Sequence, residues 1–445
     1  MQVLMRFVLG VAVISMTSAC STSAPSATGS GAPTQSLPSA RQTQQPNDGW
    51  GAAEGPVTGG SRAIKAHIYR VHNRAELARA LMAGSKLAAP IPKVIFIEGP
   101  IDLSVDDNDR PLAESDYRDP GFSWEAYARA FDPQAWGKKP VEGPLEDARK
   151  RSAERQQSVV MLHVGSNTSL IGVDNKALIK NGSLMVKNAE NVIIRNVAFE
   201  DSYDYFPQWD PKDNANGEWN SEYDNVTLYG SRRIWIDRCT FSDGARPDHL
   251  NRVSLGRPMQ FHDGLLDIVR GSDLVTVSNS HFKNHDKGSL IGNSDSRTDD
   301  AGKLRVTLHH NWFDNVKERS PRVRYGRVHV YNNLYSATPD GTYGYGYSIG
   351  VGYQSQIVAQ NNVFEIPVVA QLRVFKLWRG ERFQALGNLV NGVEVNALAM
   401  LRSQASAEAG AALNDQLDWT PTFHLAIDPT ARVAQRVRSN AGAGR

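Results

Sequence analysis

The chain has 445 residues, of which 40% are hydrophobic and 22% are charged, so its composition excludes a disordered or fibrous protein. A formal net charge of +2 excludes a general attraction to polyanions, so any anion binding must come from a local cluster of cations. The two cysteines, Cys20 and Cys239, occur without a CxxC motif or a Cys/His cluster, which argues against a zinc site.

The first twenty residues have the features of an export signal. Arg6 precedes an apolar run (7–16) that is too short to span a membrane, and small residues lead from it to Cys20. This order resembles a bacterial lipoprotein signal, in which the cysteine is lipidated. We therefore expect an exported protein, either secreted or held at the outer membrane through a lipid on Cys20. Cys239 is then expected to be a buried thiol without a partner.

Residues 21–48 consist largely of Ser, Thr, Ala, Pro, Gly and Gln. A segment of this composition cannot bury a core, so we expect a disordered linker. Folded structure is expected to begin near Gly49, with one domain covering residues 49–445.

The beginning of this domain contains helical patterns. The segment NRAELARALMAG predicts a helix with Asn73 as its N-cap and Glu76 at the third helical position, and we expect this helix to cap the fold. The segment PKVIFIEG (92–99) predicts a buried strand. A polar insertion follows at about 104–157, and its end (144–157) predicts a helix with Pro in the first turn, acidic residues early and basic residues late.

From residue 191 onward, short strand patterns recur and most end in an aromatic residue. The last residues of these patterns are Phe199, Phe241, Phe282, Phe313, Tyr335, Phe364 and Val390. The shortest interval, from Phe313 to Tyr335, is 22 residues, about one coil of a parallel β-helix. An antiparallel β-sandwich also has short strands, but no Asn-Gly or Asp-Gly hairpin joins consecutive strands in this region. The pattern favours a parallel β-helix.

Polar residues recur three positions before the end of each strand pattern. They are Asn196, Arg238, Asn279, His310, Asn332, Asn361 and Gly387. Stacked coils would align the asparagines, so we expect a hydrogen-bonded ladder at these positions inside a turn.

Three aspartates are candidate metal ligands: Asp224, Asp263 and Asp267. Carboxylates without nearby thiol or imidazole ligands favour Ca²⁺ over a transition metal. Four residues of extended strand would separate Asp263 from Asp267 by roughly 13 Å, so both could reach one ion only if the chain bends at Gly264. Aspartates are also common in turns, and spacing alone leaves that alternative open.

The segment VKERSPRVRYGRVHVYNN concentrates cations at the start of a strand. They are Lys317, Arg319, Arg322, Arg324 and Arg327. Arg319 is expected in a turn before the strand, while Arg322 and Arg324 share one face of it. Guanidinium groups suit carboxylate recognition, and Lys287 could add a point charge. A solvated basic face, nucleic acid and an acidic polymer all remain possible partners on this evidence.

Several longer runs then carry a resemblance to a known family. They are GEWNSEYDN, IWID, HDGLLD, HDKGSLIGNSDS, TLHHN, RSPRVRYGRVHVYNN, YSIGVGYQSQIVAQNN and the closing NAGAG. In this order they resemble the calcium-dependent pectate lyases of polysaccharide lyase family 1, over nearly all of residues 50–445. The resemblance implies an all-β fold, a right-handed single-stranded parallel β-helix with the N-terminal helical cap and a partly helical insertion. It also implies a pectate substrate and a Ca²⁺ cofactor.

The resemblance also implies roles for individual residues. It assigns calcium binding to Asp224, Asp263 and Asp267. Arg319 matches the family's catalytic base, and Lys287 and Arg324 match positions that bind substrate carboxylates. The chain departs from the family pattern at Arg238, where the family usually has His.

The implied reaction is eliminative cleavage of (1→4)-α-D-galacturonan (polygalacturonate) to 4,5-unsaturated oligogalacturonides. The alternatives are a pectin lyase acting on methyl-esterified pectin, a hydrolase, and a non-catalytic polyanion-binding β-solenoid. A hydrolase needs paired carboxylates as acid and base, whereas the acids here have the pattern of metal ligands. Export and the near-neutral charge disfavour nucleic acid as a partner. We expect a monomer with an alkaline activity optimum.

Overall fold

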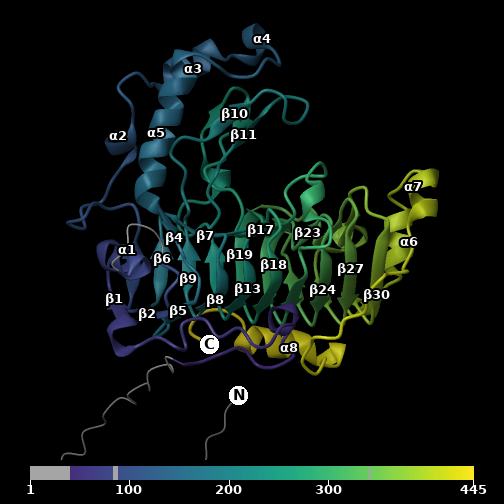
Figure 1. Ribbon diagram of the computed structural model, residues 1–445. Helices are drawn as coiled ribbons and strands as arrows, with labels where there is room; N and C mark the ends of the chain where they lie inside the picture. The colour runs from purple at the N-terminus through teal and green to yellow at the C-terminus, as the bar shows by residue number, and fades with distance from the viewer. Residues whose placement is uncertain (1–40, 84–88, 340, 342) are drawn as a thin grey trace, which may run out of the picture. The chain divides into compact units, whose positions relative to one another are not determined.

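The computed structural model describes residues 41–83, 89–339, 341 and 343–445. The predicted export signal with Cys20, and residues 21–40 of the predicted linker, lie outside the described residues. Within them, three sheets of mainly parallel strands run along one stack of coils, which confirms the predicted parallel β-helix (Figure 1).

Sheet A contains ten strands among the described residues. In spatial order they are β1 (Ile68–Val71), β2 (Lys93–Ile97), β5 (Thr168–Gly172), β8 (Glu190–Arg195), β13 (Arg232–Asp237), β18 (Asp273–Ser278), β21 (Val306–His309), β24 (Arg327–Tyr331), β27 (Gln356–Gln360) and β30 (Arg382–Leu386).

Sheet B is the sheet on which the candidate site lies. Its strands are β4 (Met161–His163), β7 (Ser183–Lys187), β12 (Val226–Tyr229), β17 (Leu266–Val269), β20 (Leu290–Ile291), β23 (Arg322–Val323), β26 (Ile349–Val351) and β29 (Phe375–Leu377). Sheet C consists of β3 (Pro100–Asp102), β6 (Leu178–Lys180), β9 (Ala198–Glu200), β14 (Thr240–Ser242), β19 (His281–Lys287), β22 (Trp312–Glu318), β25 (Leu334–Ser336), β28 (Val363–Glu365), β31 (Leu389–Val390) and the antiparallel β32 (Val393–Glu394).

The interior of the stack is apolar and aligned from coil to coil. The strand-end aromatics of sheet C stack with centroid distances of 4.5–5.3 Å from Phe199 through Phe241, Phe282, Phe313 and Tyr335 to Phe364. Offset stacking of this kind adds to the free energy gained by burying each ring. The recurring aromatic in the sequence is therefore the signature of one coil. Cys239 is a buried free thiol in the same interior, as expected.

The asparagine ladder lies one residue later than predicted. The bonded residues are Asn311, Asn333, Asn362 and Asn388, and each Nδ2 donates to the next Oδ1 at 2.9–3.0 Å. All seven predicted positions instead have left-handed backbone conformation, with φ between 48° and 60°. Asn and Gly tolerate that conformation, which explains their recurrence there. Arg238 also adopts it (φ 52°) and donates to the carbonyl of Arg445 at 3.1 Å.

The predicted helical cap and insertion are present. Helix α1 (Arg74–Met82) begins at Asn73, whose side chain accepts from the Glu76 N–H, and its buried face closes the first coil. The insertion contains α2 (Glu114–Tyr117), α3 (Trp124–Ala130), α4 (Pro133–Trp136) and α5 (Pro144–Val160). These helices share an aromatic cluster with the antiparallel pair β10 (Gln208–Asp210) and β11 (Glu218–Asn220), above the coils in Figure 1.

Ordered structure begins earlier than the expected residue 49. Gln44 and Asp48 are buried, and Asp48 pairs with His309 at 2.9 Å. The segment 41–64, with the 3₁₀ turn η1 (Trp50–Ala52), continues along sheet A and bonds in turn to Thr307, Thr276, Asn191 and Ser169. The small polar residues of this segment therefore allow it to pack closely along the surface of sheet A. Composition alone predicted a disordered linker up to residue 48 and did not indicate this packing.

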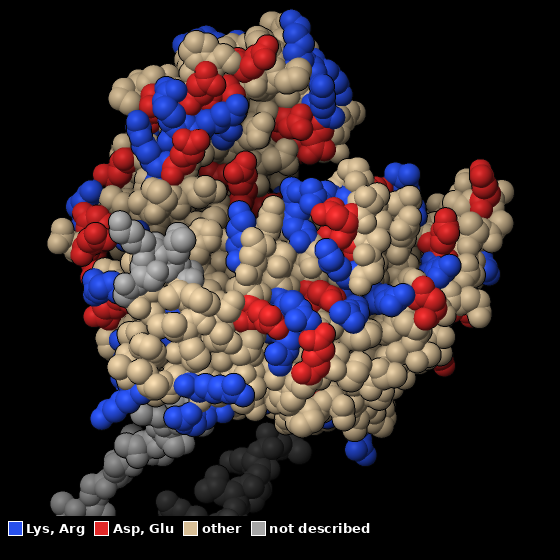
Figure 2. Space-filling view, viewed as in Figure 1, with Lys and Arg blue, Asp and Glu red and all other residues tan. Residues whose placement is uncertain are grey.

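The C-terminal part adds α6 (Ala397–Arg402), α7 (Ala407–Ala412) and α8 (Thr430–Asn440). Val433 and Val437 of α8 pack on Leu334 and Val363 of sheet C. The shorter elements are η2 (Lys65–His67), η3 (Asp248–Leu250), η4 (Thr298–Asp300), η5 (Val368–Arg373), β15 (Val253–Ser254) and β16 (Arg257–Pro258). No helix in the described part of the chain is both long and apolar enough to cross a bilayer. Figure 2 shows acidic and basic side chains interspersed over one face, in keeping with the small net charge.

Candidate active site

The three predicted aspartates lie close together at the centre of sheet B, and two of them, Asp224 and Asp267, converge. Asp267 lies on β17, directly beside Thr227 of β12, and Asp224 precedes β12 and accepts from the Thr227 hydroxyl at 2.6 Å. Asp263 precedes β17 by three residues. Parallel stacking therefore brings together residues that are about forty positions apart in sequence.

Gly264 provides the bend that the pattern required. Its N–H donates to Asp224 Oδ1 at 2.8 Å. A Cβ atom added to Gly264 would lie 2.7 Å from Asp267 Oδ1 and 2.8 Å from Asp224 Oδ1. Both carboxylate oxygens therefore converge on one small space, which a side chain at this position would fill.

The convergence of the carboxylates disturbs their ionisation. Burial, followed by the charges of Asp267 and Asp263, raises the pKa of Asp224 well above its usual range. Burial and the charge of Asp263 raise the pKa of Asp267 to about 7. Neither carboxylate has a cationic side chain bonded to it, so no hydrogen-bonded ion pair offsets the burial and the mutual repulsion that raise their pKa values.

The Asp263 carboxylate is bonded to Lys287 and not to the atoms that surround Asp224 and Asp267. Its Oδ1 accepts from Lys287 Nζ at 2.8 Å, and about a third of its side chain is exposed. Burial alone would raise its pKa, but Lys287, with smaller contributions from Arg319 and His285, outweighs burial, and the pKa is lowered. Among the described residues, no three His, Cys, Asp or Glu side chains already form a group that could hold a metal ion. The structure thus gathers Asp224 and Asp267, with Asp263 adjacent but paired to Lys287.

Arg319 lies in the turn before β23, as predicted, with left-handed backbone (φ 59°). Its Nε donates to Glu318 at 3.2 Å. Burial lowers the pKa of Arg319, but the charges of Glu318, Asp263 and Asp267 outweigh burial, and the pKa is raised. Neutralising any of these carboxylates would therefore favour a neutral guanidine at this position.

Arg322 lies on β23 and Val323 is buried beside it, whereas Arg324 follows the end of this two-residue strand instead of lying on it as expected. Arg324 pairs with Asp295 at 2.7 Å and donates to the Gly292 carbonyl. Arg322 forms no ion pair in the described structure and stacks on Trp378 at 4.4 Å. Its pKa is lowered by burial and by the charge of Arg324.

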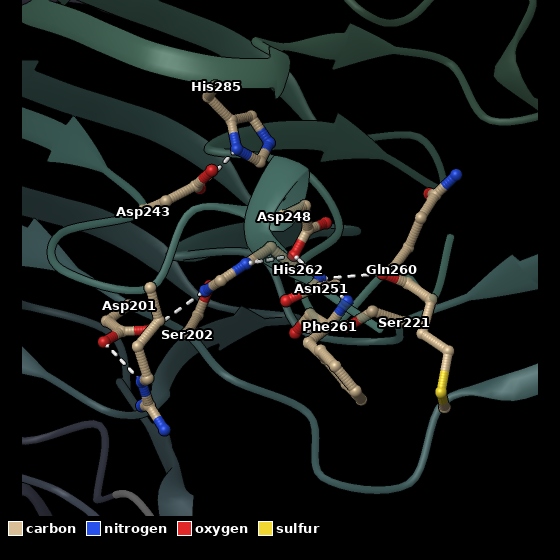
Figure 3. A network of polar contacts seen from close by, with 12 residues as sticks. Asp201, Ser202, Ser221, Asp243, Asp248, Asn251, Gln260, Phe261, His262 and His285 are labelled. Carbon is tan, nitrogen blue, oxygen red and sulfur yellow. Dashed lines mark hydrogen bonds and ion pairs between the residues drawn. The ribbon is translucent and has the colours of Figure 1, made fainter. Parts of the chain in front are cut away.

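Two buried histidines beside the aspartates were not predicted as site residues. His285 contacts Asp243 and the Asp263 carbonyl, and His262 lies between Asp201 and Asp248 (Figure 3). A sequence signal existed, because both belong to runs already singled out: His262 precedes Asp263 in HDGLLD, and His285 lies two residues before Lys287.

Comparisons with known proteins agree with this geometry. A family model described as pectate lyase matches residues 142–445. A pectate lyase of Bacillus subtilis is 44% identical over 91% of this chain and 93% of its own, and pectate lyase E of Dickeya dadantii is 34% identical over 92% and 89%. A structure of a pectate lyase bound to hexasaccharide is 43% identical and superposes with a TM-score of 0.86, covering 91% of this chain and 98% of that one.

The fold and the site define an enzyme of the polysaccharide lyase class. The chain belongs to the pectate lyase family, since both the family model and relatives above 30% identity cover most of its length.

Proposed function

We propose that the cluster on sheet B performs calcium-dependent β-elimination on polygalacturonate. The observation that carries this proposal is the pair of converging carboxylates without a bonded cation, the buried Asp224 and the half-buried Asp267, next to the cations Lys287 and Arg319. The related pectate lyase bound to hexasaccharide supports an oligosaccharide ligand in this fold.

The donor set fits a calcium ion. Asp224 and Asp267 would hold it, and Asp263 would join them by exchanging its contact with Lys287 for the ion. Oxygen ligands of this kind are the ones Ca²⁺ takes, and a divalent charge would offset the burial and the mutual repulsion that raise the pKa of two of them. When bound, the ion neutralises the uronate carboxylate and makes the neighbouring C5 hydrogen more acidic.

Arg319 is the proposed base that removes the C5 proton. It is held beside the cluster by Glu318 and is mostly buried. Glu318 contributes most to raising its pKa, but Asp263 and Asp267 also raise it, and the cofactor would neutralise the charge of these two, so the same binding event favours a neutral guanidine. Because only a minor fraction would be neutral near pH 7, activity should rise toward alkaline pH.

Lys287 and Arg324 are proposed to bind substrate carboxylates, with further cations continuing along the sheet. Asp267, Leu290, Arg322, Gly350 and Lys376 follow one another across neighbouring strands of sheet B. Strands are about 4.8 Å apart, so this row extends roughly 19 Å. Arg322 and Lys376 form no ion pair in the described structure, and Trp378 lies against both. A chain of uronates would supply the missing counter-charges.

We further propose that the protein is exported and acts on extracellular pectate as a monomer. Arg6 and the apolar run that ends before Cys20 support export. Mass spectrometry of the mature N-terminus from a membrane fraction and from the medium distinguishes lipidation of Cys20 from its removal.

One assay tests the reaction. Purified protein is incubated with polygalacturonate, and ultraviolet absorbance of the conjugated C4–C5 double bond is followed beside reducing ends. Elimination gives both signals, whereas hydrolysis gives reducing ends alone. EDTA should abolish the absorbance and added Ca²⁺ should restore it, and highly esterified pectin should react poorly. Full activity in EDTA, or a preference for esterified pectin, would contradict the proposal.

A further inference from the structure

A buried polar network surrounds His262, the residue before Asp263 (Figure 3). We call it the histidine network, and its members are Asp201, Asp243, Arg246, Asp248, His262, His285 and Tyr343. The segments that contribute them surround residues 260–264 and come from different coils. None of these residues has a role in the reaction proposed above.

His285 connects the network to the candidate site. Its ring is 1% exposed, its Nδ1 bonds to Asp243, and its Nε2 bonds to the main-chain carbonyl of Asp263 at 2.6 Å. A carbonyl oxygen and a carboxylate both accept hydrogen bonds, so both ring nitrogens act as donors. The imidazole is thereby fixed in one orientation, with one N–H directed at the residue next to Gly264.

The second histidine holds the same turn from its other side. His262 precedes Asp263, and its two ring nitrogens bond to Asp248 at 2.8 Å and to Asp201 at 3.0 Å. Asp248 also accepts from the main-chain N–H of Phe261 at 3.2 Å. Residues 261–263 are therefore bonded through their main chain or side chains to groups that are themselves buried.

The network is balanced in charge and closed by Tyr343. Three carboxylates face three cationic groups, because Arg246 binds Asp201 at 2.8 Å and each histidine bridges acceptors. The hydroxyl of Tyr343 donates to Asp243 and accepts from the Asp248 N–H at 2.6 Å. A buried ionic network is a costly way to stabilise a fold compared with apolar packing, which together with the asparagine ladder supports much of the stack.

We propose that His285, held by Asp243, is a positioning residue that fixes the main chain of Asp263 and thereby sets the affinity of the site for Ca²⁺. The inference rests on the proposed function, because it assumes that Asp263 turns from Lys287 to the ion. Groups that orient metal ligands in this way commonly change metal affinity by 10–100-fold when they are removed.

The test compares His285→Gln with His329→Gln by calorimetric titration of Ca²⁺ into the metal-free protein. His329 is the matched control, since it is equally buried but lies on β24 of sheet A. Unfolding midpoints in EDTA record the structural cost of each change. We expect His285→Gln to raise the Kd for Ca²⁺ at least about 10-fold and His329→Gln to leave it unchanged, even where both lower the midpoint.

Tyr343→Phe covers the case in which His285→Gln does not fold. It removes one oxygen that contacts Asp243 and Asp248 but neither a candidate ligand nor Arg319. It should also weaken Ca²⁺ binding, with kcat at saturating Ca²⁺ retained. An unchanged Kd in every folded variant of the network overturns the inference while leaving the proposed function intact. A parent protein that binds no Ca²⁺ overturns both.

Discussion

Asp224 accepts a 2.8 Å hydrogen bond from the main-chain N–H of Gly264, the residue that follows Asp263. This contact ties one coil of the stack to the next at the point where the candidate ligands meet. It also leaves no room for a side chain at residue 264, because an added Cβ would press on both Asp224 and Asp267.

Gly264→Ala is therefore expected to damage the site more than the fold. The methyl group would force the two carboxylates apart, so we expect Ca²⁺ affinity to fall by more than about 10-fold. Gly410→Ala is the control, since a Cβ there meets neighbours only at 3.7 Å or more. Calorimetric titration of Ca²⁺ measures the effect, and equal affinities in the two variants would contradict it.

Arg319→Lys should reduce kcat by about 10²–10⁴-fold with a small change in KM, because a positioned base acts in the transition state. Lysine keeps the positive charge but replaces the planar guanidinium group with a single ammonium group on a side chain of different shape. Arg305→Lys serves as the control, since Arg305 pairs with Asp273 on sheet A, away from the cluster. Initial rates of absorbance increase on polygalacturonate give both constants. A loss confined to KM would assign Arg319 to binding instead.

Lys376→Ala should weaken binding of long substrates more than short ones. Lys376 lies four strands from Asp267, so an oligomer that ends near Arg322 cannot reach it. We expect KM for polygalacturonate to rise several-fold and KM for the shortest cleaved oligomer to stay constant. Lys303→Ala, at an exposed residue outside this row, is the control. Equal effects on both substrates would remove Lys376 from the binding row.

Lys93→Met should stabilise the protein in a pH-dependent manner. Lys93 is fully buried on β2, and burial lowers its pKa to about 8 from 10.5. Below pH 8 the Lys93 amine is protonated in both the folded and the unfolded state, so the folded state carries the full free-energy cost of burying its charge. Between pH 8 and 10.5 the folded state releases its proton first, and wild-type stability rises.

The gain from Lys93→Met should accordingly be about 3 kcal/mol at pH 7 and should disappear as pH approaches 10.5. Urea unfolding of both proteins across this range measures it. Lys303→Met, at an exposed residue, should show no such trend. A gain that persists undiminished at high pH would mean that packing, rather than the buried charge, is responsible.

Periodicity was sufficient to predict the coils, because each one repeats the same buried aromatic and the same left-handed residue. It was insufficient to choose between adjacent asparagines such as Asn332 and Asn333. Both have a structural reason to be asparagine: one tolerates positive φ, and the other bonds to the coils on either side. Only the register of stacked strands distinguishes these two reasons.

The candidate site was predictable as a set of residues through family resemblance, but its geometry was not. The meeting of Asp224 with Asp267 depends on which coils are neighbours and on the bend at Gly264. The contact between Asp263 and Lys287, and the histidines behind it, depend on loops of irregular length. Sequence spacing carries no information about such contacts.

The segment 41–64 has a mechanical consequence for the whole stack. A solenoid whose coils touch only their neighbours can lose its end coils one at a time. Here one strap bonds to residues of four separate strands of sheet A. The coils between β5 and β21 therefore cannot separate without first releasing that segment, so opening of the early coils is coupled to the coils at the centre, where the aspartates are.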